Sequence, residues 1–537
     1  MGPCRVLLAV LAVTSISVTE ARSQATAPPP PRGTPAPTAA GSGAAVTDSA
    51  RDHEDDEDAT PGQPRKPLVA PAEPKARVQW LRDRVAAAIT TAAARLAHAR
   101  ITVSAVDLAT GNELVNHEAD RAMSLASNAK LLTSVAALAD LGGGFRWRTG
   151  VLGAEPDDKG VVAGDLVLRG RGDPMLGPDD FRALAADVAA RGVRSVDRLV
   201  IDASYFDDAV EPPHFEEQKA ETAGFRAPVA GLGVARSAVT VTVVPDPGGT
   251  ATVTLDPDPG DYIRLSTHDL TSVTRGRTRI KVDVKLKPDH MELVVSGQIR
   301  WGEGSWEVRK RVSDPARFAA ELFRRALVDH GVQVKARAIG RGAAPPTAKL
   351  LAVHESAPLS DVLRHMNKLS DNYLAESVLK TLGAETKATP GPATWNDGIA
   401  AMHAYLAKIG LPAAGYRAEN GSGLFNASEV SARQLTTLLG AAHKDFRIGP
   451  DLLASLPVGG VDGTLARRWH ARAARGRVRA KTGTLDKVVT LAGYVAVDSQ
   501  HPIGFAVLVN DVPAGQRASA RAAADEIVEA LVAYLGG

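Results

Sequence analysis

The sequence is poor in cysteine and in net charge. Cys4 is the only cysteine among 537 residues, and it lies in an N-terminal segment that we expect to be removed. A mature protein without cysteine has no disulfide, no thiolate metal site and no cysteine nucleophile. The 63 basic side chains nearly balance the 61 acidic ones, and no long basic run occurs. The charge balance therefore gives no indication of nucleic acid as a partner.

Metal-ligand patterns and membrane-length apolar runs are also lacking. The thirteen histidines form no His-x-x-x-His pair, so we expect no metal and no cofactor. The apolar run Val6 to Val13 follows Arg5 and precedes small residues at Ser23 and Ala25. This pattern predicts a signal peptide over residues 1–25, cleaved after Ala25, and export to the periplasm. The alternative is an uncleaved anchor, although the run is short for a membrane span.

A proline-rich segment separates the predicted leader from the folded protein. Residues 26–76 hold eleven of the 34 prolines, no aromatic residue and an acidic cluster between Asp52 and Asp58. Such a composition buries too little apolar surface to offset the entropy lost on ordering, so we expect a disordered spacer. The whole chain is 44% hydrophobic and 23% charged, which is typical of soluble globular domains.

The hydrophobic pattern changes twice beyond the spacer. Residues 77–147 begin with a helical repeat from Val78 to Leu96 and continue with two alternating strands around the turn Thr110-Gly111-Asn112. Residues 148–348 predict a β-rich insertion of short strands, at 161–168, 239–244, 250–255, 280–286 and 291–295, with two helices at 181–191 and 316–331.

Residues 349–537 return to a helical pattern and then end in strands and a helix. The last elements are predicted as strands at 478–484, 488–498 and 503–510 and an amphipathic helix at 517–535. An amphipathic helix leaves peripheral membrane contact open, but its alanine-rich face favours packing on the sheet.

The stretch from Ser124 to Gly142 predicts one helix with Ser127 and Lys130 in its first turn. Residues three apart lie on one helix face, so the Lys130 amine reaches the Ser127 hydroxyl, as a serine nucleophile and its base require. Apolar residues bury the rest of this helix, and Gly142 suits its end. The quartet Ser-x-x-Lys is common by itself and occurs again at 377–380, where an ordinary helix segment is the simpler interpretation.

Two further motifs follow in order. Ser370-Asp371-Asn372 falls at a junction between two predicted helices, and Lys481-Thr482-Gly483 lies on a predicted strand. Ser-x-x-Lys, Ser-Asp-Asn and Lys-Thr-Gly together are the signature of penicillin-binding proteins and class A β-lactamases. More than two hundred residues separate Ser127 from Ser370, a longer interval than in class A β-lactamases.

Together with these motifs, four further stretches look like those of one family, at 168–176, 419–424, 458–465 and 481–494. Residues 77–537 resemble the D-alanyl-D-alanine carboxypeptidase/endopeptidase family of low-molecular-weight penicillin-binding proteins, the penicillin-binding protein 4 type. The resemblance implies an α+β fold, in which a penicillin-binding-protein and β-lactamase-like transpeptidase domain, an antiparallel sheet flanked by helices, carries a large β-rich insertion. It also implies peptidoglycan stem peptides ending in D-Ala-D-Ala as substrates and β-lactam antibiotics as ligands.

The resemblance assigns roles to the motif residues. Ser127 would attack the peptide carbonyl, Lys130 would act as base, Ser370 would relay a proton, and Asn372 would bind the substrate amide. To act as base near neutral pH, Lys130 must lose about three pKa units, and a nearby cation, Lys481, is the stronger candidate for that effect.

The Lys-Thr-Gly strand is implied to bind the substrate. Gly483 would leave the path of an incoming peptide open, and the hydroxyls of Thr482 and Thr484 would bind its terminal carboxylate. The N–H groups of Ser127 and Thr484 would form the oxyanion hole.

Two other functions use the same residues. A serine β-lactamase or esterase carries the same motifs, but the long insertion and the lack of a clear counterpart of the class A deacylating glutamate favour the peptidase. A non-catalytic peptidoglycan-binding scaffold is the second alternative, and the intact motif residues argue against it.

Overall fold

The structure is a computed structural model that describes residues 68–218, 220–287, 290–469, 472–498 and 500–536. The predicted signal peptide and residues 26–67 of the predicted spacer lie outside the described residues. Helix α1 (Pro74–Arg95) begins in the last residues of the segment that we assigned to the spacer.

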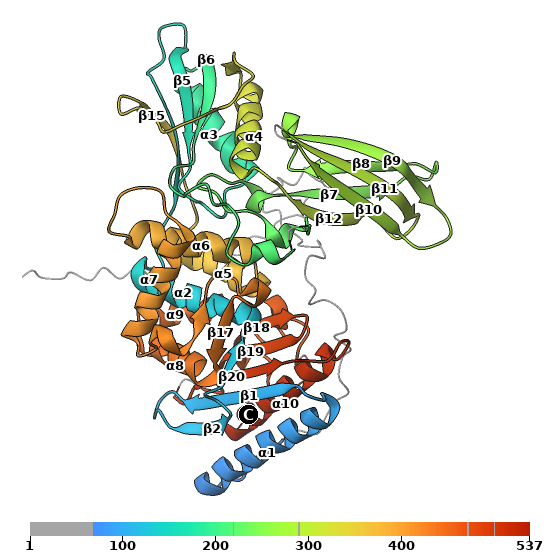
Figure 1. Cartoon of the computed structure of the whole chain (residues 1–537), viewed down its shortest axis with the longest axis vertical. Helices are drawn as coiled ribbons and strands as arrows, with labels where there is room; N and C mark the ends of the chain where they lie inside the picture. The colour runs from blue at the N-terminus through green and yellow to red at the C-terminus, as the bar shows by residue number, and fades with distance from the viewer. Residues whose placement is uncertain (1–67, 219, 288–289, 470–471, 499, 537) are drawn as a thin grey trace, which may run out of the picture. The chain divides into compact units, whose positions relative to one another are not determined.

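A five-stranded antiparallel sheet combines strands from both ends of the described chain (Figure 1). The strand order is β18–β19–β20–β1–β2, with β1 at Arg100–Asp107, β2 at Glu113–His117, β18 at Val478–Leu485, β19 at Val488–Val495 and β20 at Ile503–Asn510. The predicted hairpin is confirmed, because β1 and β2 pair antiparallel around the Thr110-Gly111-Asn112 turn. β18 lies at an edge of this sheet.

Helices α1 and α10 (Arg517–Tyr534) pack together on one face of the sheet, side by side in Figure 1. Leu81, Val85 and Ile89 are buried at helical spacing, as predicted for the first helix. The final helix buries its apolar face against β19 and β20. Among the described residues, no helix combines the length and the apolar character needed to cross a bilayer.

The opposite face of the sheet carries a cluster of helices with a second core. These helices are α2 (Ala129–Asp140), α5 (Leu359–Leu369), α6 (Asn372–Thr386), α7 (Trp395–Lys408), α8 (Ala432–Lys444) and α9 (Gly449–Ser455). α8 packs on β1 and β20, and α2 packs against α5, α6 and α7. Gly142, with a left-handed φ of 79°, follows α2 as predicted. A small sheet of β3 (Ala122–Ser124), β16 (Arg417–Ala418) and β17 (Ser428–Ser431) adjoins these helices.

Residues 148–355 have a core of their own. A six-stranded mixed sheet contains β4 (Arg148–Gly153), β5 (Val161–Arg169), β6 (Ser195–Asp202), β13 (Gln333–Val334), β14 (Gly340–Arg341) and β15 (Lys349–Glu355). It packs with α3 (Pro178–Ala190) and α4 (Pro315–Asp329), both predicted helices. β15 follows the boundary that we drew at residue 348 and pairs antiparallel with β4, with Arg148 opposite Glu355. The chain therefore enters and leaves this unit at neighbouring positions.

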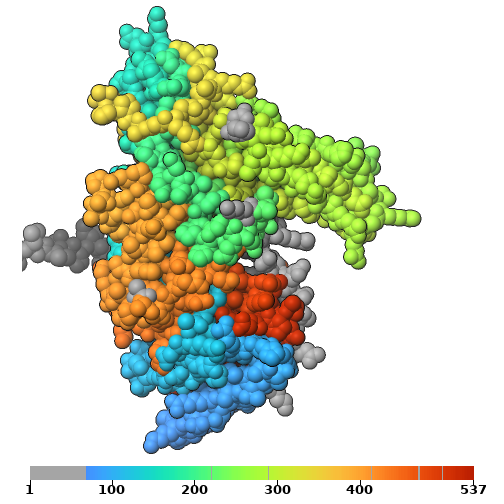
Figure 2. All heavy atoms as spheres, viewed as in Figure 1, coloured from blue at the N-terminus to red at the C-terminus, as the bar shows by residue number. Residues whose placement is uncertain are grey.

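Two three-stranded sheets complete this unit. One contains β7 (Ala238–Pro245), β8 (Ala251–Asp256) and β12 (Trp306–Arg311), and the other contains β9 (Ile263–Val273), β10 (Arg279–Leu286) and β11 (Met291–Arg300). The predicted strands in this region are confirmed. Most side chains of β9 are exposed, and this segment is light green on the molecular surface in Figure 2.

Candidate active site

Ser127 lies in a short 3-10 turn, η1 (Ala126–Asn128), just before α2. The prediction that one helix begins at Ser124 is wrong, because Ser124 belongs to β3 and its backbone forms hydrogen bonds with the Asn510 side chain. Ala126 has a left-handed φ of 46°, which separates the strand direction from the helix direction. Lys130 remains in the first turn of α2, as predicted.

The Lys130 amine contacts the Ser127 hydroxyl. Lys130 Nζ lies 2.9 Å from Ser127 Oγ, 2.7 Å from Asn372 Oδ1 and 3.1 Å from the Ser422 carbonyl oxygen. The Lys130 side chain is fully buried, whereas Ser127 is half-buried. A neutral amine has two N–H donors and one lone pair. The two acceptors match the donors, and the lone pair is then available to the Ser127 O–H.

The Ser-Asp-Asn motif lies at the junction between α5 and α6, as predicted. Ser370 follows α5 with a left-handed φ of 60°, and Asp371 caps α6 by accepting a 3.0 Å hydrogen bond from the Leu374 N–H. The other carboxylate oxygen of Asp371 accepts a 2.8 Å hydrogen bond from Arg236 Nη1. Burial opposes ionisation of Asp371, but Arg236 and the cap hydrogen bond hold the pKa of this carboxyl below its usual range.

Strand β18 brings the third motif to the second. Lys481 is fully buried, and its Nζ lies 2.8 Å from both Ser370 Oγ and the Thr482 carbonyl oxygen. The Thr482 hydroxyl lies 2.7 Å from that of Thr464, and Thr484 is half-buried further along the strand. The structure therefore brings Ser127, Lys130, Ser370, Asn372 and the Lys-Thr-Gly strand together, from three separate parts of the chain.

Gly483 allows β18 to lie directly against the turn that carries Ser127. A Cβ at this position would lie 2.3 Å from Thr490 Oγ1, 2.7 Å from the Leu125 carbonyl oxygen and 3.1 Å from Ala126 Cβ. The absence of a side chain is thus required by internal packing. The sequence suggested a different reason, an open path for the peptide substrate.

The sequence reasoning missed Glu376 and Ser422. Glu376 lies one turn after Asn372 on α6 and is fully buried. Its two carboxylate oxygens accept hydrogen bonds from the N–H groups of Gly421, at 2.9 Å, and Ser422, at 2.8 Å. Burial raises the pKa of Glu376. The spacing of four residues from Asn372 was the available sequence signal for this carboxylate.

The second Ser-x-x-Lys quartet lies within α6 and faces other partners. Lys380 Nζ is buried 2.6 Å from Asp207 Oδ1 and 2.8 Å from the Ala209 carbonyl oxygen, over the ring of Trp395. These contacts hold Lys380 as a structural cation. The quartet thus lies in an ordinary segment of a helix, which was the simpler interpretation of its sequence.

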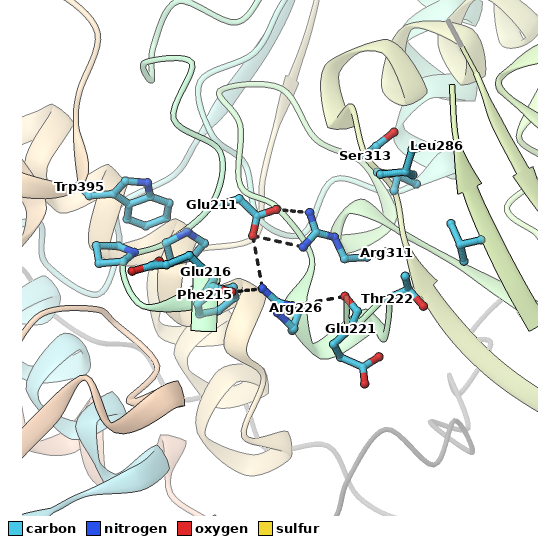
Figure 3. Close-up of a pocket in the computed structure, with 14 residues that line it drawn as sticks. Glu211, Phe215, Glu216, Glu221, Thr222, Arg226, Leu286, Arg311, Ser313 and Trp395 are labelled. Atoms are coloured by element: carbon cyan, nitrogen blue, oxygen red, sulfur yellow. Dashed lines mark hydrogen bonds and ion pairs between the residues drawn. The ribbon is translucent and has the colours of Figure 1, made fainter. Parts of the chain in front are cut away.

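A cavity of about 490 Å³ is lined in part by a chain segment that also contacts the site. Figure 3 shows the side chains that line this cavity. Within it, Glu211 pairs with Arg311 and lies 3.8 Å from the buried Arg226. Phe225, the neighbour of Arg226, accepts a 3.3 Å hydrogen bond from Asn372 Nδ2. This segment therefore lines the cavity with side chains and contacts Asn372 with its backbone.

Among the described residues, no group of three or more possible metal ligands occurs.

The whole chain was also compared with known proteins. A family model described as the D-Ala-D-Ala carboxypeptidase 3 (S13) family matches residues 81–531. The chain belongs to this family. It is a serine-type D-Ala-D-Ala carboxypeptidase of the penicillin-binding protein 4 type, as the motif resemblance predicted.

Individual relatives agree with this assignment. The chain is 34% identical over 437 residues to the D-alanyl-D-alanine carboxypeptidase of Actinomadura sp. (strain R39), covering 78% of this chain and 79% of that protein. It is 24% identical over 394 residues to the D-alanyl-D-alanine carboxypeptidase DacB of Haemophilus influenzae, covering 73% and 81%.

The solved structures establish the fold. The crystal structure of penicillin binding protein 4 from Haemophilus influenzae matches with a TM-score of 0.70 at 22% identity, over 82% of this S13 carboxypeptidase and 98% of that chain. A complex of the same protein with a β-lactam matches with a TM-score of 0.66 at 23% identity and the same coverage. The predicted α+β fold is confirmed.

Proposed function

We propose that Ser127 is the nucleophile of this carboxypeptidase and that Lys130 is its base. The observation that carries the proposal is the 2.9 Å contact between Ser127 Oγ and Lys130 Nζ. The nucleophile keeps some access to solvent while the base is fully buried, which disfavours a charged amine before substrate binds. A serine paired with a desolvated amine is an activated nucleophile.

The reaction proceeds through a serine ester. Ser127 Oγ forms a bond to the carbonyl carbon between the two terminal D-alanines, and its proton passes to Lys130 Nζ. The C–N bond then breaks, and the proton on Lys130 passes through the Ser370 hydroxyl to the nitrogen of the leaving D-alanine, which makes Lys130 neutral again. Water cleaves the ester in the second half of the reaction, with Lys130 again accepting a proton. The 2.8 Å contact between Lys481 Nζ and Ser370 Oγ supports this relay, because it keeps a proton donor next to the hydroxyl.

The substrate peptide adds to the edge of β18 beyond Ala480, because residues 457–459 already bond to the first residues of this strand. An edge strand offers unpaired backbone groups to an extended peptide. The hydroxyls of Thr482 and Thr484 bind its terminal carboxylate, and the N–H groups of Ser127 and Thr484 stabilise the oxyanion. Asn372 binds the substrate amide, for which its Nδ2 exchanges the hydrogen bond to the Phe225 carbonyl oxygen.

The enzyme is exported, and its substrates are peptidoglycan stem peptides that end in D-Ala-D-Ala. The pattern of residues 1–25 and the family activity support this location and substrate class. Hydrolysis of a D-alanyl cross-link needs the same nucleophile and the same base, so the proposal includes endopeptidase activity. β-Lactam antibiotics acylate Ser127 because their strained amide takes the place of the scissile peptide.

Intact-mass analysis after incubation with penicillin tests the nucleophile. The wild-type protein gains one penicilloyl group and releases D-alanine from a D-Ala-D-Ala pentapeptide, whereas Ser127→Ala does neither. Ser377→Ala is the matched control, because it removes the same hydroxyl group from the serine of the second Ser-x-x-Lys quartet. It should keep both activities. An adduct on Ser127→Ala would assign the nucleophile to another residue.

A further inference from the structure

We propose that the buried carboxylate of Glu376 is a positioning residue that sets the charge of Lys130 and, with it, the pH range of acylation. The inference rests on the proposed roles of Ser127 and Lys130. It adds to them a residue outside the three motifs, which acts on the base through a loop and through its own charge.

Glu376 organises the loop that supplies one acceptor to Lys130. The Ser422 N–H donates to Glu376 Oε1 at 2.8 Å, and the carbonyl oxygen of the same Ser422 accepts from Lys130 Nζ at 3.1 Å. The Gly421 N–H donates to Glu376 Oε2 at 2.9 Å, and the Gly421 carbonyl accepts from the Thr133 hydroxyl at 2.8 Å. One side chain therefore holds the N–H groups of two consecutive residues, and the second of them, Ser422, contacts the base through its carbonyl oxygen.

The charge of Glu376 acts on Lys130 directly. Burial raises the pKa of Glu376, while the two backbone N–H donors and the positive charge of Lys130 favour its carboxylate form. Interaction between two ionisable groups is mutual, so the carboxylate in turn favours the ammonium form of Lys130. Since Glu376 is 1% exposed, solvent screens this interaction little.

Other charged groups around the base have partners of their own. Lys481 on β18 contacts the Ser370 hydroxyl, and Asp371 at the start of α6 pairs with Arg236. Glu419, which precedes the loop, pairs with Arg417 and with His214. Glu376 is thus the acidic group of α6 that both bonds to the loop and interacts with the charge of Lys130.

The arrangement suits a base that gains and loses a proton in every catalytic cycle. Lys130 takes the Ser127 proton during acylation, and the Glu376 carboxylate stabilises the ammonium that results. The same stabilisation raises the pH at which the resting amine becomes neutral. An opposite unit charge close to a titrating group shifts the pKa of that group by about one to three units.

The test measures the rate of acylation by penicillin between pH 5 and pH 10, by intact mass, with the full mature protein. In the wild-type protein the rate rises with pH as Lys130 becomes neutral. Glu376→Gln keeps the size of the side chain and removes its charge, so the rising limb should move to lower pH by about one to two units. Glu376→Asp withdraws the charge by one methylene, and its limb should move part of that distance.

Thr133→Val is the matched control, because it removes a hydrogen bond to the same loop without removing a charge. It should lower the rate and leave the limb at the wild-type pH. A limb that stays at the wild-type pH in both Glu376 variants would overturn the inference and leave Glu376 a purely structural clamp. If Glu376→Gln does not fold, the Glu376→Asp limb decides by itself.

The outcome is separable from that of the proposed function. Failure of the proposed function appears in the wild-type protein, as an absent adduct, or as an adduct that survives Ser127→Ala. Failure of the present inference leaves the adduct and its dependence on Ser127 intact and changes only the position of the pH limb.

Discussion

The ion pair between Arg236 and Asp371 joins the insertion to the Ser-Asp-Asn junction, and its removal should weaken both stability and acylation. The two side chains lie 2.8 Å apart and are 22% and 11% exposed. Arg236 belongs to a turn whose residues Ala235, Arg236 and Ser237 have φ values of 51°, 55° and 49°. Non-glycine residues in this conformation cost about 1 kcal/mol each, so surrounding contacts must hold the turn in place.

The expected loss follows from the burial of the pair. Removing one partner of a buried ion pair costs about 3–5 kcal/mol, because the other charge is left without compensation. Arg309 also acts on Asp371 and the pair retains some solvent, so we expect Arg236→Ala to lower the free energy of unfolding by about 2–3 kcal/mol. Asp371 lies between Ser370 and Asn372, and a displacement of about 1 Å should slow acylation about 100-fold.

Urea denaturation measures the first quantity, and the rate of penicilloyl adduct formation measures the second. Arg198→Ala is the control, because Arg198 and Asp165 form an exposed pair in the same insertion, worth less than about 1 kcal/mol. Arg236→Ala combined with Asp371→Asn should be destabilised by less than the sum of the single changes. A loss below about 1 kcal/mol with an unchanged acylation rate would refute the reasoning.

Two further predictions concern packing and pH. Gly483→Ala places a Cβ 2.3 Å from Thr490 Oγ1, so the acylation rate should fall about 100-fold in a folded protein, and Thr490→Ala in the same chain should restore part of it. Near-ultraviolet circular dichroism checks the fold, and an unchanged rate would contradict this packing argument. Hydrogen bonding to Asp173 raises the pKa of His354 above its usual value. Protonated His354 therefore adds to the free energy of unfolding, fully below about pH 6.5, and this contribution is lost as pH rises through the pKa of the folded state. In urea denaturation between pH 6 and pH 9, His354→Gln should lose more stability relative to wild type at the acidic end, and a difference independent of pH would contradict the assignment.

The sequence predicted elements whose pattern is local. Alternation identified β7 and β10, and helical spacing identified α1, because each pattern reflects one buried face. The stretch from Ser124 to Gly142 has apolar residues at helical spacing and no proline, so it suits a helix along its whole length. The strand pairing of Ser124 in β3 and the left-handed Ala126 delay the start of the helix, so that Ser127 lies in a 3-10 turn and α2 begins at Ala129.

The motif residues were predictable because their spacing and order carry a known chemistry, whereas their partners were not. The Ser422 carbonyl contacts Lys130, but a backbone acceptor has no residue type by which a sequence can mark it. Glu376 has a residue type, yet its role depends on a loop that begins more than forty residues later in the chain. A buried carboxylate and an exposed one look alike until the fold places the loop beside it.

Helix α6 links the insertion to the base Lys130. Its first residue, Asn372, contacts Lys130 through one amide atom and the Phe225 carbonyl oxygen through the other. Its cap, Asp371, is held by Arg236, which also precedes β7 in the insertion. The insertion therefore positions the start of α6 from one side, while Glu376 connects the next turn to the loop at Lys130. Asn372 and the loop held by Glu376 both contact Lys130. Changes in the insertion should therefore alter the rate of acylation through Asn372, without any contact with the nucleophile.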